Sequence, residues 1–178
     1  LPSGAHAESA VDGPAPEWFF AEGATHSGFA LFYLLQNPNA FDVQVDVTYL
    51  RPAPAAPVAK TYLVAARSRT TVWVNLDDAR LASTDVSARL AVQGGYGIVA
   101  ERAMYWGPNG VWIEAHNSPG VTAEALAWGF AEGAEDGLDT SGLQFDSYFL
   151  VANSSTNVLN LKAPRGQAGR KGIGRRRR

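Results

Sequence analysis

Residues 97–106 read GIVAERAMYW, an apolar run interrupted by the adjacent pair Glu101 and Arg102. Because successive side chains of a strand point to opposite faces, the two charges lie on opposite faces, each among apolar neighbours. A strand that is apolar on both faces is typical of a position between two covered surfaces, where a charge must be paired or must reach an edge. We therefore interpret residues 97–106 as the central strand of the domain.

The charge on this strand predicts an ion network. We expect Arg102 to pair with Glu22 or Glu114 at the edge of the core, with Glu101 and His116 in the same structural network. Removing one member of a buried pair costs about 3–5 kcal/mol, so Arg102→Ala is expected to lower the melting temperature. The alternative is a catalytic set of Glu22, Glu101 and His116, which could serve hydrolysis or bind a cation.

The rest of the chain alternates short apolar strands with turn signals. Residues 43–49 alternate valine and tyrosine with polar residues, as a half-buried antiparallel strand does. Further strands are predicted at residues 18–24, 29–36, 62–64, 71–76, 86–92 and 111–115. Residues 77–84 are expected to hold a helical turn, and residues 116–120 to leave the sheet. About eight strands without an amphipathic helix predict an all-β antiparallel sandwich, Ig-like or jelly-roll-like.

Two segments of the sequence are repeated. WFFAEGA at 18–24 returns as WGFAEGA at 128–134, and FALFYLLQN at 29–37 returns as FDSYFLVAN at 145–153. The offset of about 110 residues exceeds the period of solenoid repeats and fits tandem domains.

This repeat divides the chain into four parts. We expect a linker at 1–17, one full β-sandwich repeat at 18–127, the start of a second repeat at 128–161 and a disordered basic tail at 162–178. The apolar residues that open the second repeat, Trp128 and 145–152, are expected to pack against the first.

Composition excludes several classes of site. The 178 residues are 46% hydrophobic and 18% charged, and they include no cysteine, so disulfides and thiolate metal sites are absent. No apolar run is long enough for a membrane span, and no signal peptide is visible, so we interpret the chain as a fragment or a processed product. Nucleophile elbows, phosphate loops and paired-histidine metal motifs are also absent from the sequence, so no metal or cofactor is expected.

The net charge of −2 conceals an uneven distribution. Residues 162–178 hold eight of the 15 lysines and arginines and none of the 17 acidic residues, so the remainder is strongly acidic. An arginine-rich tail could bind anionic surfaces, but it has no interleaved aromatics, and we expect no nucleic-acid partner. The other interpretation is that the tail comes from an out-of-frame reading of a GC-rich gene, which would generate arginine, glycine, alanine and proline.

Three tryptophans raise a different possibility. Trp73, Trp106 and Trp112 could form a platform on which a sugar stacks. Packing in the core and at its rim is the interpretation we favour, because large aromatics dominate the cores of sandwiches.

The motifs and their order resemble a known family, the tandem β-sandwich repeats of large secreted and cell-surface proteins of bacteria. The resemblance runs from Trp18 to about residue 155 and rests on WFFAEG (18–23), LLQNP (34–38), VDVTY (45–49), ARSR (66–69), DVS (85–87), ERAMYW (101–106) and HNSPGV (116–121). It ends near Asn153, since residues 161–178 have no strand pattern. It implies an accessory or adhesive module without enzymatic activity of its own.

We therefore expect a non-catalytic, extracellular or cell-surface module that spaces, anchors or presents other domains. Its expected partners are neighbouring repeats or catalytic domains of the same parent protein, and cell-wall glycan is a further candidate. The first alternative is a carbohydrate- or cell-wall-binding module. The second is a hydrolase that uses Glu22, Glu101 and His116.

Overall fold

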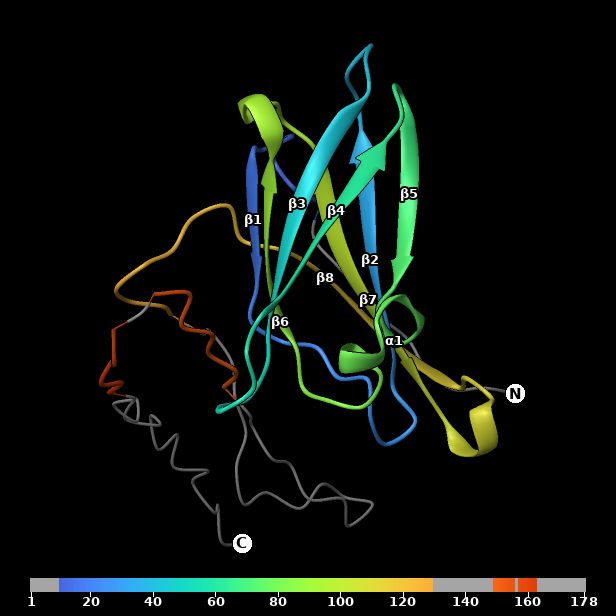
Figure 1. Cartoon of the computed structure of the whole chain (residues 1–178), viewed down its shortest axis with the longest axis vertical. Coiled ribbons are helices and arrows are strands. Elements are labelled where there is room, and N and C mark those ends of the chain that lie inside the picture. Colours follow the sequence, from blue (N-terminus) through green and yellow to red (C-terminus); the bar gives the residue numbers. More distant parts are fainter. Residues whose placement is uncertain (1–9, 130–148, 156, 163–178) are drawn as a thin grey trace, which may run out of the picture.

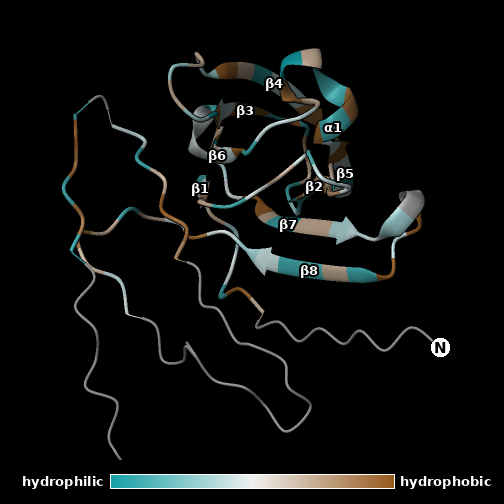
Figure 2. Ribbon diagram, turned by 90° about the horizontal axis from the view of Figure 1, so that it is seen from below, coloured by the Kyte–Doolittle hydropathy of each residue, from teal (hydrophilic) through white to brown (hydrophobic). Residues whose placement is uncertain are grey.

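The chain folds into two antiparallel four-stranded sheets that pack face to face (Figures 1 and 2). The computed structural model describes residues 10–129, 149–155 and 157–162. One sheet has the order β1-β6-β3-β4, from β1 (Glu17–Phe20), β6 (Ser87–Val92), β3 (Val43–Leu50) and β4 (Val58–Val64). The other has the order β5-β2-β7-β8, from β5 (Ser68–Trp73), β2 (Ala30–Asn37), β7 (Val99–Trp106) and β8 (Glu114–Pro119). The predicted all-β sandwich is confirmed.

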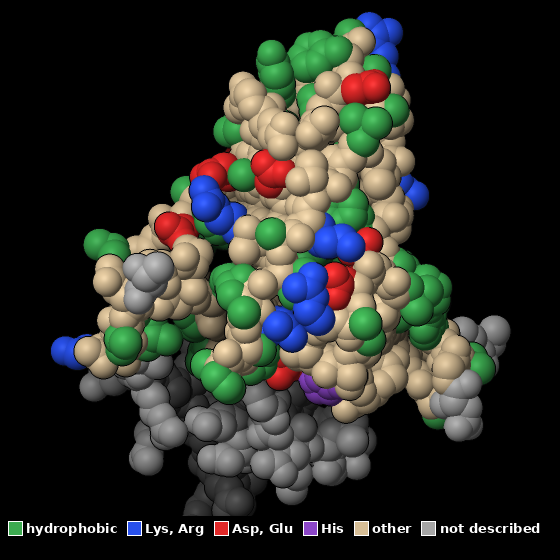
Figure 3. Space-filling model, in the orientation of Figure 1, with side chains coloured by type: hydrophobic (Ala, Val, Ile, Leu, Met, Phe, Trp, Pro, Cys, Tyr) green, Lys and Arg blue, Asp and Glu red, His purple; other side chains and the backbone are tan. Residues whose placement is uncertain are grey.

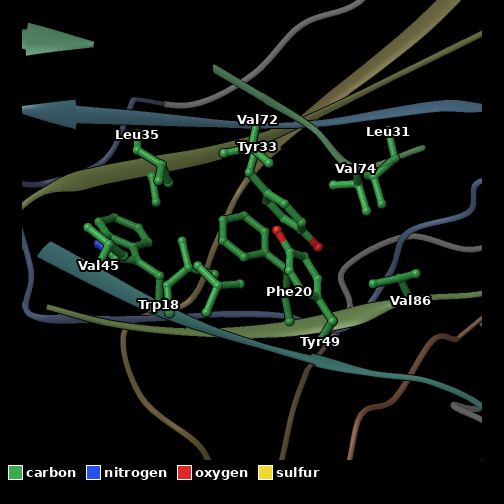
Figure 4. Packing of buried hydrophobic residues seen from close by; sticks show 14 of the residues in the cluster. Trp18, Phe20, Leu31, Tyr33, Leu35, Val45, Tyr49, Val72, Val74 and Val86 are labelled. Carbon is green, nitrogen blue, oxygen red and sulfur yellow. The ribbon is translucent and has the colours of Figure 1, made fainter. Parts of the chain in front are cut away.

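The hydrophobic core lies between the two sheets and follows from their alternation. Every second residue of β3, from Val43 to Tyr49, is buried, while the residues between them are partly or fully exposed. In Figure 4 the rings of Phe20, Tyr33 and Tyr49 pack together in this core, and the Trp18 ring lies apart from them, on the side of Val45. The buried Trp18 indole donates a hydrogen bond to the carbonyl of Ile98, 3.0 Å away, so its polar atom is satisfied as well.

Strand β7 is central in its sheet, between β2 and β8, as expected from the sequence. Its register places Arg102 opposite Tyr33 and Glu101 opposite Leu34. Arg102 points into the core and is buried, whereas Glu101 is only half-buried. The prediction that both faces are covered is therefore wrong for the outer face, which no further layer of the described residues covers.

Two strand ends differ from the sequence-based expectation. The run 71–76 leaves the strand after Trp73 and forms the helical turn α1 (Val74–Asp77), because the Asn75 side chain accepts a hydrogen bond from Leu31 and donates one to Phe29. Strand β8 begins at Glu114 rather than at residue 111, and residues 116–119 pair with β7 instead of leaving the sheet. Polar residues are tolerated there because β8 is an edge strand.

Short 3₁₀ turns complete the described part: η1 (Ala79–Leu81), η2 (Gln93–Gly95) and η3 (Pro108–Gly110). The first confirms the helical turn expected within residues 77–84. The second is the glycine turn between β6 and β7, where Gly94 and Gly95 have positive φ angles of 77° and 73°.

Chain segments outside the strands close the sandwich at its β1 edge. Ala15 and Ile98 exchange backbone hydrogen bonds, as do Phe19 and Val121. The linker interpretation is therefore wrong from Ala15 onward, since these residues belong to the sandwich.

The second repeat meets the first only loosely in the described part: residues 150–153 border a hollow beside residues 21–23 and 85–87 without entering the core. Trp128 is 55% exposed and Val151 58% exposed, and residues 149–155 and 157–162 contain no strand. The rest of the repeated segment, residues 130–148, and the basic tail from residue 163 lie outside the described residues.

Candidate functional site

The candidate residues divide between the two faces of the sheet β5-β2-β7-β8. On the inner face, Arg102 is the one charged side chain that is buried among the described residues. Its Nη1 donates hydrogen bonds to the Glu22 carboxylate at 2.5 Å and to the Glu22 carbonyl at 3.2 Å. Its Nη2 is 2.7 Å from Nδ1 of His116. Because arginine only donates, Nδ1 must be the acceptor and carries no proton in this arrangement.

This inner cluster, Glu22, Arg102 and His116, joins three distant segments. Glu22 follows β1, Arg102 lies in the centre of β7 and His116 lies in the edge strand β8. The glycine after Glu22 lets the backbone come this close to the core. A Cβ on Gly23 would lie 2.8 Å from a methyl group of Leu31 and 2.8 Å from the carbonyl oxygen of Val86. The Ala-Glu-Gly motif thus combines a charge partner for Arg102 with a close backbone approach.

Two buried polar atoms beside this cluster have no hydrogen-bond partner among the described residues: Nε of Arg102 and the hydroxyl of Tyr33. Burial strongly raises the pKa of Tyr33, and its neighbour Tyr49 raises that pKa further, while the positive charge of Arg102 lowers it. Tyr33 is therefore a neutral side chain at any physiological pH. Sequence reasoning missed its place beside Arg102, which depends on the register between β2 and β7.

The predicted ion network is present only in part. Glu22, Arg102 and His116 come together, whereas Glu101 lies on the outer face and Glu114 is exposed at the start of β8, opposite Trp106. The candidate hydrolase residues Glu22, Glu101 and His116 are therefore split between the two faces of the sheet. Within residues 10–129, 149–155 and 157–162, no cluster of histidine and carboxylate side chains could hold a metal ion.

The outer face of the same sheet carries four packed rings, which we call the aromatic cluster: Phe32, Trp73, Tyr105 and Trp112. Phe32 lies at its centre, with its ring centroid 5.2 Å from Trp73 and 5.7 Å from both Tyr105 and Trp112. Tyr105 stacks on Trp112 at 5.1 Å, and the two indoles meet nearly edge to face at 5.9 Å. Trp73 remains 40% exposed and Trp112 46% exposed.

Two of the three predicted tryptophans therefore meet. Trp106 instead packs against Phe29, with their ring centroids 5.4 Å apart, and no ring contact with the aromatic cluster is found for it within the described residues. Phe32 and Tyr105 were not singled out from the sequence. Alternation with the buried Tyr33 and Met104 was the signal that could have placed them on the outer face.

Polar side chains lie beside the aromatic cluster on the same face. Leu34 separates Thr71 from Glu101 in the next row of the sheet, and Gln36 pairs with Arg69 in the row after that. Within the described residues, none of these four polar side chains makes a side-chain hydrogen bond or an ion pair: Arg69, Gln36, Thr71 and Glu101.

The charged side chains of the opposite sheet differ in this respect. Figure 3 shows lysines and arginines next to acidic side chains on the face that it presents. Arg89 of β6 lies 2.5 Å from Glu17 of β1, and in the connection after α1 Arg80 lies 2.8 Å from Asp78. Hydrogen bonds from Arg80 hold the pKa of Asp78 well below its usual range. These charged side chains are paired, whereas Arg69 and Glu101 make no ion pair with any described residue. Polar side chains without a partner among the described residues also occur on the opposite sheet, at Gln44 and Thr48.

Comparisons with known proteins support the fold. No model of a known protein family matches the chain, and no curated protein matches it. The crystal structure of Thermotoga maritima 1070 is similar, with a TM-score of 0.55 at 12% identity over 64% of this chain and 98% of that one. The Anabaena sensory rhodopsin transducer matches with a TM-score of 0.43 at 21% identity, over 53% of this chain and 99% of that one. At such identities the first likeness shows the fold alone.

Proposed function

We propose that the chain is a non-catalytic β-sandwich module that spaces, anchors or presents other domains of its parent protein at the cell surface. The observation that carries this proposal is the inner cluster. Arg102 binds Glu22 and His116 and so ties the segment after β1 to the two strands β7 and β8. Two of the three residues that the hydrolase alternative needs, Glu22 and His116, are engaged in holding the sandwich together.

The separation of the acidic residues supports the same conclusion. General acid–base catalysis needs its groups within hydrogen-bond reach of one substrate. Glu22 and Glu101 cannot meet that condition together, because β7 itself lies between the inner cluster and the outer face. Glu22 does border a shallow hollow with Arg51 and Asp85, but neither Glu101 nor His116 lines it.

The extracellular location is supported by the resemblance to bacterial surface repeats and by the repeated Trp-x-Phe-Ala-Glu-Gly motif at 18–23 and 128–133. Tandem repeats suit a spacer, because each added copy extends the reach of the parent protein. In the described part of the chain, no helix has the length and apolar character to cross a membrane. Neighbouring repeats of the same protein are the proposed partners.

A substrate screen tests the non-catalytic role. The purified chain should show no turnover of glycan, ester or peptide substrates, and Glu101→Gln should change nothing in that screen. Glu22→Gln should alter thermal stability alone. Turnover that disappears in Glu101→Gln, with the far-ultraviolet circular dichroism unchanged, would instead establish an enzyme.

Cellular location needs a separate experiment. Intact cells of the source organism are treated with a protease that cannot enter them, and the module is followed by immunoblotting. Loss of the module while a cytoplasmic marker survives is the expected result. Survival of both would contradict the surface location.

A further inference from the structure

We infer that the outer face of the sheet β5-β2-β7-β8 is a binding site for a neutral oligosaccharide, with the aromatic cluster as its stacking end. This goes beyond the proposed function, which assigns no ligand. The site is the row Trp73–Phe32 with Tyr105 and Trp112, continued along the strands by Thr71, Glu101 and Gln36.

The aromatic end has the form of a corner. Phe32 is the floor against which the three other rings pack, and the two indole planes stand at 74° to one another. Tyr105 covers one face of Trp112 at an interplanar angle of 25° and holds that indole in place. A sugar ring has an apolar C–H face and polar edges, so it fits rigid, half-exposed indoles that are apolar on their faces and polar at one end.

The polar end supplies hydrogen-bonding groups without fixed partners. The row of Thr71 and Glu101 lies about 7 Å along the strands from the row of Phe32, and the row of Gln36 lies about 14 Å away. Ligand sites combine an apolar floor with a few placed polar groups that fix orientation. Together these rows form a strip that is longer than one sugar ring, and it begins at an aromatic surface.

The low net charge of this outer face favours a neutral ligand over a charged one. It carries one basic residue, Arg69, and one acidic residue, Glu101, among the strand residues that face outward. Single-stranded nucleic acids also stack on aromatics, but they require a basic groove that tracks the phosphates. A neutral polyhydroxylated chain complements a face with little net charge and several free donors and acceptors.

A second exposed aromatic pair provides a matched control. Phe41 and Tyr96 are 46% and 48% exposed, and their ring centroids are 4.7 Å apart. They belong to the β2–β3 and β6–β7 connections and make no ring contact with the aromatic cluster among the described residues. Tyr96→Ala therefore removes an exposed aromatic ring of similar accessibility without altering the proposed site.

Binding is measured with the whole chain by isothermal titration calorimetry and tryptophan fluorescence. The probes are cellohexaose, xylohexaose, mannohexaose and N-acetylchitohexaose. We expect saturable binding of at least one probe with a change in tryptophan emission. Trp112→Ala and Trp73→Ala should each weaken that binding at least tenfold, Glu101→Gln should weaken it severalfold, and Tyr96→Ala should leave it unchanged.

Several results would overturn the inference. One is the absence of binding to all four probes at millimolar concentration, and another is binding that Trp73→Ala and Trp112→Ala leave intact. Trp73→Phe serves as a second variant if the alanine protein unfolds in the melting control. Self-association that Trp112→Ala abolishes, seen by sedimentation, would assign the face to a second copy of the chain. Cleavage of a bound probe would contradict the non-catalytic role instead, so the two proposals fail in distinguishable ways.

Discussion

The two faces of the sheet β5-β2-β7-β8 differ in how far they bury residues that are adjacent in sequence. On the inner face Arg102 and Tyr33 are almost fully buried, and the arginine is bound by Glu22 and His116. On the outer face Glu101 and Phe32, each next in sequence to one of these residues, lie on a half-exposed surface. Residues that are adjacent in sequence thus belong to a structural ion cluster on one face of the sheet and to a candidate binding site on the other.

This difference shows how burial decides the role of a charge. A buried arginine is stable only where carboxylates or other acceptors surround it, so its partners are committed to the fold. A half-exposed carboxylate such as Glu101 is solvated by water and needs no partner, so it is available to a ligand. The variants below test this contrast, beginning with the largest expected effect.

Removing the carboxylate of the inner cluster should have the largest effect on stability. Glu22→Ala leaves the buried Arg102, whose side chain is only 2% exposed, without its counter-charge. We expect the free energy of unfolding to fall by about 3–5 kcal/mol in urea denaturation.

The reverse substitution sharpens this expectation. Arg102→Met should cost less, about 1–2 kcal/mol, because the remaining Glu22 is 36% exposed and water can solvate it. The double variant Glu22→Ala/Arg102→Met should be more stable than Glu22→Ala alone. Equal losses in the two single variants would contradict the asymmetry between a buried and a half-exposed partner.

Glycine 23 should show the next largest effect, because it positions Glu22. In Gly23→Ala the added methyl group meets Leu31 and the carbonyl of Val86, both at 2.8 Å, and overpacking of this kind costs about 1–3 kcal/mol. Gly13→Ala is the matched control, since a Cβ there would meet nothing within 4 Å. In thermal melts, Gly23→Ala should have a clearly lower melting temperature than Gly13→Ala. Identical melting temperatures would count against the close approach of the Gly23 backbone to Leu31 and Val86.

Two buried tyrosines of the core, Tyr33 of β2 and Tyr49 of β3, should differ in their effect on stability. The Tyr49 hydroxyl bonds that of Tyr62 at 2.8 Å, so Tyr49→Phe should cost about 1 kcal/mol, whereas Tyr33→Phe removes an unpartnered hydroxyl and should be nearly neutral.

Burial raises the pKa of both Tyr33 and Tyr49 in the folded chain. Below pH 10 the two tyrosines are protonated in the folded and in the unfolded chain. Above pH 10 they ionise in the unfolded chain but stay protonated in the folded one. The free energy of unfolding should therefore fall as the pH rises past about 10.

Denaturation at several pH values measures that slope. The decline between pH 9 and pH 11 should be shallower in Tyr33→Phe than in the wild type, because one of the groups that ionises on unfolding is gone. An unchanged slope would show that Tyr33 ionises equally in both states.

The smallest expected effect lies on the outer face. Glu101→Gln should change the free energy of unfolding by no more than about 0.5 kcal/mol, because Glu101 has no partner within the described residues. A loss comparable to that of Glu22→Ala would erase the contrast between the two faces. Chemical denaturation of both variants under one set of conditions makes the comparison direct.

Much of the fold was already determined by the sequence. Period-two alternation predicted the strand at residues 43–49 with its inward face, and the apolar run 97–106 predicted a central strand with Glu101 and Arg102 on opposite faces, because side-chain direction in a strand depends on local geometry alone. Turn residues marked where strands end, as Gly94 and Gly95 do between β6 and β7, where both adopt the positive φ angles that glycine favours. Pairing of Arg102 with a carboxylate also followed from the sequence, because a buried charge requires a counter-charge.

Only the tertiary structure decided which residues meet. Glu22 rather than Glu114 pairs with Arg102, because the segment after β1 brings Glu22 to the centre of β7, while Glu114 lies opposite Trp106 at the end of that strand. The aromatic cluster depends on the order β5-β2-β7-β8, which brings Phe32 beside both Trp73 and Tyr105. Strand order and register come from contacts between distant segments, and local alternation carries no information about them.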